Sequence, residues 1–295
     1  MKRLDASEIV FKVIAYTLLT IFALFCLYPF VYTVVAAISS KEAVEAGKVV
    51  ILPIGFQLEA FKHVFNDRSF WMSYTSTLFI TALGTIWSML ISILGGYALS
   101  KTRIPFNRGL NFFLVFTMWF SAGMIPTYIN YSQTKEIFAD IGLVDQKWVV
   151  VIAMGIAAYN IILLRNAFQG VPKEIEEAAT VDGANEFQIA SKVYIPMSKA
   201  SIATVALFYG ISRWNGYFWA KQVMVGEEQV PPLQVYIRTL LDSIENSDTK
   251  PEYDGFSANS MFYAMIVCAI IPIIVIYPFI QKYFAAGVNL GGVKE

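Results

Sequence analysis

The part of the chain best suited to a specific contact is Glu174–Pro196, a polar run between two long apolar segments. Pro172 fits the first turn of a helix, and three glutamates follow it where a helix N-terminus favours negative charge. Ile175, Ala178 and Ala179 recur at spacings of three and four residues, so one face of this helix is narrow, small and apolar. A short helix with such a face and flanking acids is suited to docking in a groove of another protein.

The same run predicts two helices joined by a turn. We expect the first helix over Lys173–Thr180, a turn at Gly183, and a second helical run over Glu186–Tyr194 that leads to Pro196. Glycine permits the turn because it has no side chain to restrict its backbone. The docking face would therefore belong to a compact helix–turn–helix.

The spacing of seven residues in this run resembles the "EAA loop" of ABC-importer membrane subunits. The family pattern is Glu-Ala-Ala, three residues, Gly, nine residues, Ile, one residue and Leu-Pro. This chain keeps every spacing and departs only by Val193 for Ile and Ile195 for Leu, which retain shape and apolarity. The resemblance implies that the run couples to a separate cytosolic ATPase through Glu174, Glu177, Ala178, Ala179, Asp182, Gly183 and Pro196.

Other segments extend the resemblance along nearly the whole chain. They are similar to carbohydrate-uptake permeases of the maltose-transporter G-subunit type, and Ala122–Tyr128 is similar to the branch served by lipoprotein receptors for complex oligosaccharides. The family implies an all-α membrane protein, a type I ABC importer transmembrane domain. The similar segments are Leu27–Ser40, Gly95–Gly109, Ser121–Asn130, Arg213–Ala220 and Gly287–Glu295.

The family also implies a heteromeric importer of oligosaccharides. Its partners would be a second, F-type permease, two copies of a cytosolic ATPase and an extracellular lipoprotein sugar-binding protein. The sequence has no Gly-x-x-x-x-Gly-Lys-Ser/Thr loop to hold phosphates, so we expect no cofactor in this chain and ATP with Mg²⁺ on the partner ATPase. The family further implies that the C-terminal tail, Val288–Glu295, reaches the ATPase interface.

A sugar path calls for aromatic faces that stack on sugar rings and for amides that bind hydroxyl groups. Residues of these types lie in or beside three expected membrane segments, and each has a competing interpretation as packing or as part of an interfacial aromatic belt. The resemblance also implies that much of the sugar contact falls on the partner permease. The candidates are Tyr128, Asn130, Tyr131, Tyr159, Asn160, Trp214, Asn215, Tyr217 and Trp219.

Arg213 is a charged residue inside an expected spanning segment, where a charge is costly and normally faces a cavity or a partner. One interpretation is that its guanidinium binds the carboxylate of an acidic sugar. The other is that a carbonyl group, or a carboxylate of the partner chain, satisfies it. The sequence favours neither interpretation.

The composition is that of a membrane protein, with a mean hydropathy of +0.56, 57% hydrophobic residues and 15% charged residues. The net charge is zero and gives no support for nucleic-acid binding. The single His63 cannot supply a metal cluster, and Cys26 and Cys268 are expected to be lipid-facing or core thiols. We expect residues 1–295 to form one permease domain of the bacterial cytoplasmic membrane, without catalytic residues.

Six apolar segments approach the roughly 20 residues that a spanning helix needs. With the N-terminus inside, the cytosolic segments hold 12 Lys and Arg against 8 Asp and Glu, whereas the outer segments hold 9 against 14. This bias favours a topology with both termini in the cytosol and places residues 169–199 there as well. We also expect a short surface helix in the first outer loop. The expected spans are 12–38, 72–99, 109–131, 148–168, 200–220 and 259–283.

Three other classes of function fit less well. A secondary transporter would need more charges at membrane depth or an inverted repeat, and neither is evident in the sequence. A membrane enzyme would need clustered His, Asp or Glu at membrane depth, which the sequence lacks. An importer of a non-sugar solute would share the same loop, and only the family resemblance outside the loop speaks against it.

Overall fold

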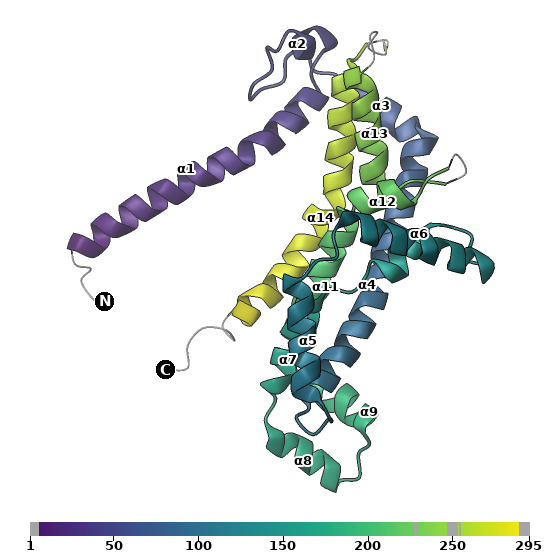
Figure 1. The fold of residues 1–295 in the computed structure, drawn as a ribbon. Helices are drawn as coiled ribbons and strands as arrows, with labels where there is room; N and C mark the ends of the chain where they lie inside the picture. The colour runs from purple at the N-terminus through teal and green to yellow at the C-terminus, as the bar shows by residue number, and fades with distance from the viewer. Residues whose placement is uncertain (1–5, 227–228, 247–252, 254, 289–295) are drawn as a thin grey trace. The chain divides into compact units, whose positions relative to one another are not determined.

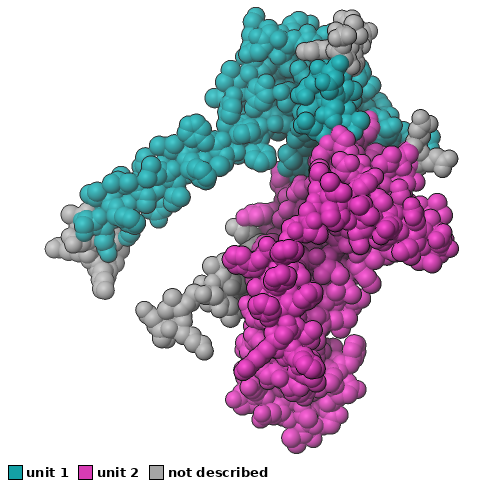
Figure 2. Space-filling model, in the orientation of Figure 1, with its two compact units in different colours: residues 1–71, 237–271 teal, residues 72–236, 272–295 magenta. Residues whose placement is uncertain are grey.

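The computed structural model describes residues 6–226, 229–246, 253 and 255–288, and the regular structure within these ranges is helical (Figure 1). The predicted all-α class is therefore confirmed. The chain divides into two compact units, one of Met1–Trp71 and Ile237–Ile271 and one of Met72–Tyr236 and Pro272–Glu295 (Figure 2). The tail after Val288, for which an ATPase contact was expected, lies outside the described residues.

The first unit has a small core near the end of its first helix. Val35, Ala36 and Val44 are buried there, and Tyr32 packs edge-on against Tyr263 with ring centroids 5.6 Å apart. The short helix predicted in the first outer loop is present as α3, and its place on the membrane surface stays a prediction. The unit comprises α1 (Ala6–Ala37), α2 (Lys41–Glu45), α3 (Glu59–Asn66), the start of α4 (Arg68–Ser100), most of α13 (Leu233–Asn246) and the first half of α14 (Ala258–Val288).

The second unit contains most of the other helices, two of which, η1 and η2, are single π-helical turns. Figure 1 shows α8 and α9 beyond the neighbouring ends of α4 and α7. In chain order after α4, the unit comprises α5 (Asn107–Trp119), α6 (Met124–Asp140), η1 (Val149–Ala153), α7 (Ala158–Gln169), α8 (Lys173–Val181), α9 (Glu186–Ile189), η2 (Ala190–Tyr194), α10 (Ile195–Met197), α11 (Lys199–Trp214) and α12 (Phe218–Val223).

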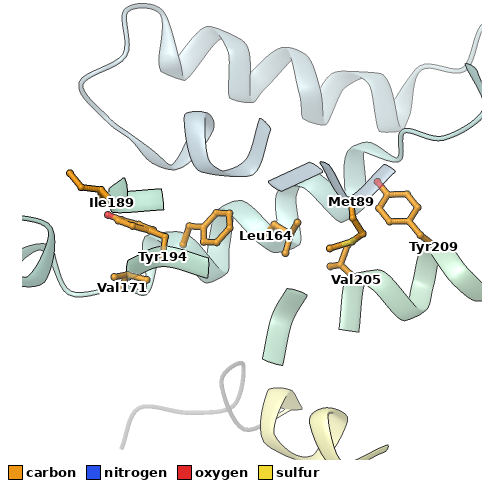
Figure 3. Packing of buried hydrophobic residues seen from close by; sticks show 8 residues of the cluster. Met89, Leu164, Val171, Ile189, Tyr194, Val205 and Tyr209 are labelled. Carbon is orange, nitrogen blue, oxygen red and sulfur yellow. The ribbon is translucent and has the colours of Figure 1, made fainter. Parts of the chain in front are cut away.

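A row of buried side chains runs through the second unit, from Tyr209 and Met89 at one end to Tyr194 and Ile189 at the other (Figure 3). The row depends on a close approach of α4 to α7, because a Cβ on Gly96 would lie 3.0 Å from the Cβ of Leu164. The absence of a side chain at Gly96 thus permits the close packing of the two helices. The row is completed by Leu164, Phe168, Val171 and Val205.

The third expected span, 109–131, is wrong as a single helix. Helix α5 ends at Trp119, α6 begins at Met124, and the two are bent by 113°. Gly123 has a left-handed φ of 87°, and Pro126 in the first turn of α6 has no N–H to continue a helix. Apolar composition predicted the length of the segment, whereas these two residues determine its break.

The fourth and fifth expected spans, 148–168 and 200–220, are also interrupted. An irregular stretch separates η1 from α7, and three residues lie between the end of α11 and the start of α12. A Cβ on Gly155 would collide with Nη2 of Arg213 and lie 2.7 Å from Oγ of Ser88, while a Cβ on Gly216 would lie 3.2 Å from the carbonyl oxygen of Arg213. Both breaks are therefore shaped around Arg213.

Each of the remaining expected segments, 12–38, 72–99 and 259–283, forms one continuous helix. Within the described residues, α1, α4 and α14 are long and apolar enough to cross a membrane, and the bent pair α5–α6 makes a fourth segment of sufficient length. The most apolar window of α1 has no residue buried within the chain. Lipid or protein outside the first unit must therefore cover it, because an apolar helix of this length is not stable in water.

Candidate functional site

A cavity of about 440 Å³ opens in the second unit where the breaks in its helices meet. Ligand pockets of proteins generally measure about 300–1,000 Å³, so a small ligand or part of a larger one fits here. Of the predicted path residues, the cavity brings together Arg213, Asn215, Tyr217 and Trp219. The rest of its wall consists of Thr77, Ile80, Val150, Met154, Ser212, Gly216, Phe218, Ala220 and Pro232.

Arg213 belongs to the wall of this cavity, and the residue is 8% exposed. It donates hydrogen bonds to the backbone carbonyls of Val150 and Val151, the second at 3.1 Å, and to Oγ of Ser88 at 3.3 Å. These three acceptors are neutral. Of the two interpretations of Arg213, contact with a carbonyl is thus present, and its positive charge is not balanced by a carboxylate among the described residues.

The backbone groups that the interrupted helix leaves free are satisfied by side chains from α4 and α11. Nε1 of Trp87 donates to the carbonyl of Ile152 at 3.2 Å, and the hydroxyl of Tyr209 accepts from the N–H of Ala157 at 3.2 Å. The Tyr209 hydroxyl also lies 2.7 Å from Oγ of Ser92. Irregular backbone at membrane depth is stable only when such groups find partners within the protein.

We expect Tyr209→Phe to lower the unfolding free energy by about 1–2 kcal/mol, because the partly buried N–H of Ala157 would lose its acceptor. Thermal unfolding of the detergent-solubilised importer measures the change. Tyr16→Phe is the control, because Tyr16 is 68% exposed on α1. Equal melting temperatures for the two variants would contradict a structural role of the Tyr209 hydroxyl.

The other predicted path residues do not line the cavity. Trp214 is buried and packs edge-on against Tyr74, with ring centroids 5.7 Å apart, and Asn160 is buried in α7. Tyr131 is half-buried and packs edge-on against Trp219 of the cavity wall, with ring centroids 5.3 Å apart. The remaining three residues are exposed on this chain. They are Tyr128, Asn130 and Tyr159.

Several cavity residues were missed by sequence reasoning. Thr77 and Ser212 bring hydroxyl groups to the wall, and Phe218 adds a third aromatic ring beside Tyr217 and Trp219. Phe218 follows directly on Tyr217 in the segment already singled out, so its aromatic type was a usable signal. Thr77 carried no such signal, because serine and threonine are common along α4.

A second candidate site is the predicted helix–turn–helix, which the structure forms with bounds close to those expected. Gly183 has a left-handed φ of 79°, and the N–H of Ala184 closes the turn on the carbonyl of Ala179 at 3.0 Å. Asn185 and Gln188 then form a reciprocal cap at the start of α9, with both hydrogen bonds at 2.9 Å. Pro196 lies in α10, directly after η2.

The residues expected to couple to an ATPase divide into two groups by exposure. Ala179 is partly buried and packs against the core row of Figure 3. The other members of the set are exposed, and Val181 next to them is 87% exposed. The exposed members are Glu174, Glu177, Ala178, Asp182, Gly183 and Pro196.

Comparisons with known proteins place this geometry in context. Residues 8–290 match the family model described as "Binding-protein-dependent transport system inner membrane component". The chain is 35% identical to the polygalacturonan/rhamnogalacturonan transport system permease protein YtcP of Bacillus subtilis (strain 168), over 96% of this chain and 98% of that protein. Protein LplC of the same organism is 34% identical, over 90% of this chain and 88% of LplC. A chain in the crystal structure of a bacterial ABC transporter involved in the import of the acidic polysaccharide alginate is 41% identical with a TM-score of 0.85, over 96% of this chain and 100% of that chain.

Proposed function

This chain belongs to the family of binding-protein-dependent transport system inner membrane components, and on that premise we propose that it imports oligosaccharides that carry uronic acids. As a member of this family it is a multi-pass permease of the cytoplasmic membrane, a transport subunit rather than an enzyme. The observation that carries the proposal is the likeness to a chain of an alginate importer over the full length of that chain. Polygalacturonan, in the name of the 35% identical relative, is also a polymer of an acidic sugar.

The cavity supports an acidic oligosaccharide as substrate. Its wall combines the aromatic rings of Tyr217 and Trp219 with the amide of Asn215, which suit the faces and hydroxyl groups of sugars. Arg213 adds a positive charge whose acceptors are neutral. The field of that charge favours an anionic ligand in the cavity even though the guanidinium itself is engaged by the backbone.

The proposal includes six membrane crossings with both termini in the cytosol. They are made by α1, α4, the bent pair α5–α6, the interrupted segment η1–α7, α11 and α14, in agreement with the charge bias of the connecting segments. The partners are a second, F-type permease, two copies of a cytosolic ATPase that bind ATP and Mg²⁺, and an extracellular lipoprotein receptor that delivers the sugar.

Helix α8 is the proposed contact with the ATPase. Its exposed side presents Glu174, Glu177 and Ala178, and the turn adds Asp182 and Gly183. The carboxylates suit basic or donor groups on the partner, while the small side chain of Ala178 permits a close approach. Closure of the ATPase dimer would then move α8 as a rigid body and change access to the cavity.

We expect acidic oligosaccharides to stimulate ATP hydrolysis by the complete importer in proteoliposomes by about tenfold, a common size of allosteric coupling. The panel sets oligogalacturonates and oligoalginates against neutral oligosaccharides of the same length, delivered by the lipoprotein receptor. Stimulation by the neutral set alone would contradict the proposed substrate and retain the importer. Stimulation by neither set, with the complex intact and the receptor loaded, would contradict a sugar as the substrate.

A further inference from the structure

The short basic loop between α4 and α5 contains a buried lysine. The side chain of Lys101 is 7% exposed, and its Nζ lies 2.7 Å from Oε1 of Glu176 on α8. Glu176 is itself only 17% exposed, unlike Glu174 and Glu177 on the same helix. Glu176 therefore points into the protein, toward the end of α4, rather than toward a partner.

Two tyrosine rings enclose this ion pair. The Lys101 ammonium lies 3.8 Å from the ring centroid of Tyr194 and 4.6 Å from that of Tyr97, distances at which a cation is attracted to the ring face. The hydroxyl of Tyr194 donates a hydrogen bond to the other carboxylate oxygen of Glu176. Burial raises the pKa of the Glu176 carboxyl, but the contacts with Lys101 and Tyr194 outweigh it and hold that pKa below its usual value.

A second set of contacts, exposed to solvent, joins the end of α4 and the following loop to α9. Arg103 pairs with Glu186 at the start of α9, and the hydroxyl of Tyr97 donates to the same carboxylate at 2.8 Å. Asn107 at the start of α5 stabilises the α4–α5 loop. Its side-chain amide donates hydrogen bonds to the carbonyls of Leu99 at 3.0 Å and Lys101 at 2.9 Å. Both halves of the helix–turn–helix are thus held by one short loop.

We propose that Lys101 and Glu176 form a latch that locks α8 to the end of α4, so that movement of α8 is delivered to the helix that lines the cavity. This inference rests on the proposed function, since it takes α8 as the contact with the ATPase. Lys101, Glu176 and Tyr194 are positioning residues that touch neither ATP nor sugar.

The arrangement favours transmission over simple anchoring for two reasons. An ion pair withdrawn from solvent loses far more when one partner is removed than an exposed pair does, so α8 cannot swing freely from α4 while the latch is closed. Tyr194 also belongs to the core row that continues to Met89 on α4 and to Tyr209 on α11 (Figure 3). A displacement of α8 can therefore be transmitted through these packed side chains to α4 and α11, which contribute Thr77 and Arg213 to the cavity wall.

The test uses the complete importer in proteoliposomes with Lys101→Met, Glu176→Gln and the double variant. Methionine keeps a stem between the two rings and removes the charge. We expect each single variant to retain the bound ATPase and to lower the sugar transported per ATP by about tenfold, equivalent to about 1.4 kcal/mol. Because the two residues act as a pair, the double variant should also show about a tenfold loss rather than about a hundredfold one.

Lys192→Met is the matched control, because Lys192 is an exposed lysine in η2, within the segment Glu174–Pro196 that also contains Glu176. It should stay within about twofold of the wild type, as is usual for an exposed charge. Tyr194→Phe keeps the ring, removes one hydrogen bond to Glu176, and should give an intermediate loss of about threefold, which guards against misfolding of Lys101→Met.

Three outcomes would overturn the latch. The first is a normal transport-to-ATP ratio in Glu176→Gln, and the second is a multiplicative loss in the double variant. The third is loss of the bound ATPase from Glu176→Gln, which would place Glu176 in the docking surface instead. Failure of the ATPase to co-purify with the wild-type permease is a different result and would contradict the proposed docking function itself.

Discussion

Arg213→Gln is expected to abolish oligosaccharide uptake and to lower the unfolding free energy by about 2 kcal/mol or more. The reason is structural: the buried carbonyls of Val150 and Val151 would lose their donors. Thermal unfolding of the solubilised complex and uptake into proteoliposomes measure the two effects. Glutamine has one amide group in place of the guanidinium fork, so it cannot reach all three acceptors.

Arg213→Lys separates the charge from the geometry. Lysine keeps the positive charge but not the planar fork, and we expect it to lose stability and uptake nearly as much as glutamine does. Arg238→Gln serves as the control, because Arg238 is 52% exposed and pairs with Asp242 one turn away on α13, so its loss should change little. Two results would show instead that Arg213 acts as a ligand of the sugar. One is normal uptake by Arg213→Lys. The other is normal stability of Arg213→Gln together with a loss of acidic-oligosaccharide uptake.

The sequence predicted the continuous parts of the fold because they depend on local information. An apolar run of sufficient length predicts α1, α4 and α14, and two adjacent glycines predict the close contact that α4 makes with α7. The helix–turn–helix was also predictable, since Gly183, the acids of α8 and the spacing to Pro196 lie within one short stretch. Whether each residue expected to contact the ATPase is exposed depends on which face of α8 packs against the core row, and the sequence near α8 does not contain that information.

The interruptions were not predictable from hydropathy, because an apolar residue contributes equally to a straight helix and to a broken one. The break after η1 is stable only because Trp87, Tyr209 and Arg213 arrive from α4 and α11 to satisfy its backbone. Arg213 was recognised as unusual from its position alone. Its partners could not be identified from the sequence, because two are backbone carbonyls more than 60 residues away in the chain and the third is the hydroxyl of Ser88, 125 residues away.

Gly183→Asp is expected to uncouple the importer, with at least about a tenfold loss of transport while the permease stays in the membrane. The φ of 79° at this turn is left-handed, and a side chain there would meet no atom of this chain within 4 Å. Backbone strain for aspartate in this region is therefore about 1–2 kcal/mol at most. The larger effect comes from a new charge beside Asp182 in the surface proposed to dock the ATPase.

Gly142→Asp is the matched control, because Gly142 has a φ of 88° and also has nothing within 4 Å of its Cβ position, but lies in a segment proposed to face outward. It imposes the same backbone strain and the same charge, so it should leave the response of the ATPase to loaded receptor unchanged. Normal transport by Gly183→Asp with a normal amount of bound ATPase would contradict the docking role of this turn. Equal losses in both variants would assign the effect to strain.

The two alanines of α8, Ala178 and Ala179, should respond differently to the same substitution. Ala178→Asp adds a charge to the exposed side of α8 and should uncouple transport without changing the melting temperature. Ala179→Asp adds the charge against the core row and should lower the melting temperature as well, because it partly buries a carboxylate against apolar side chains. Identical melting temperatures for these variants would contradict the burial of Ala179, whereas normal coupling in Ala178→Asp would remove the exposed side of α8 from the contact with the ATPase.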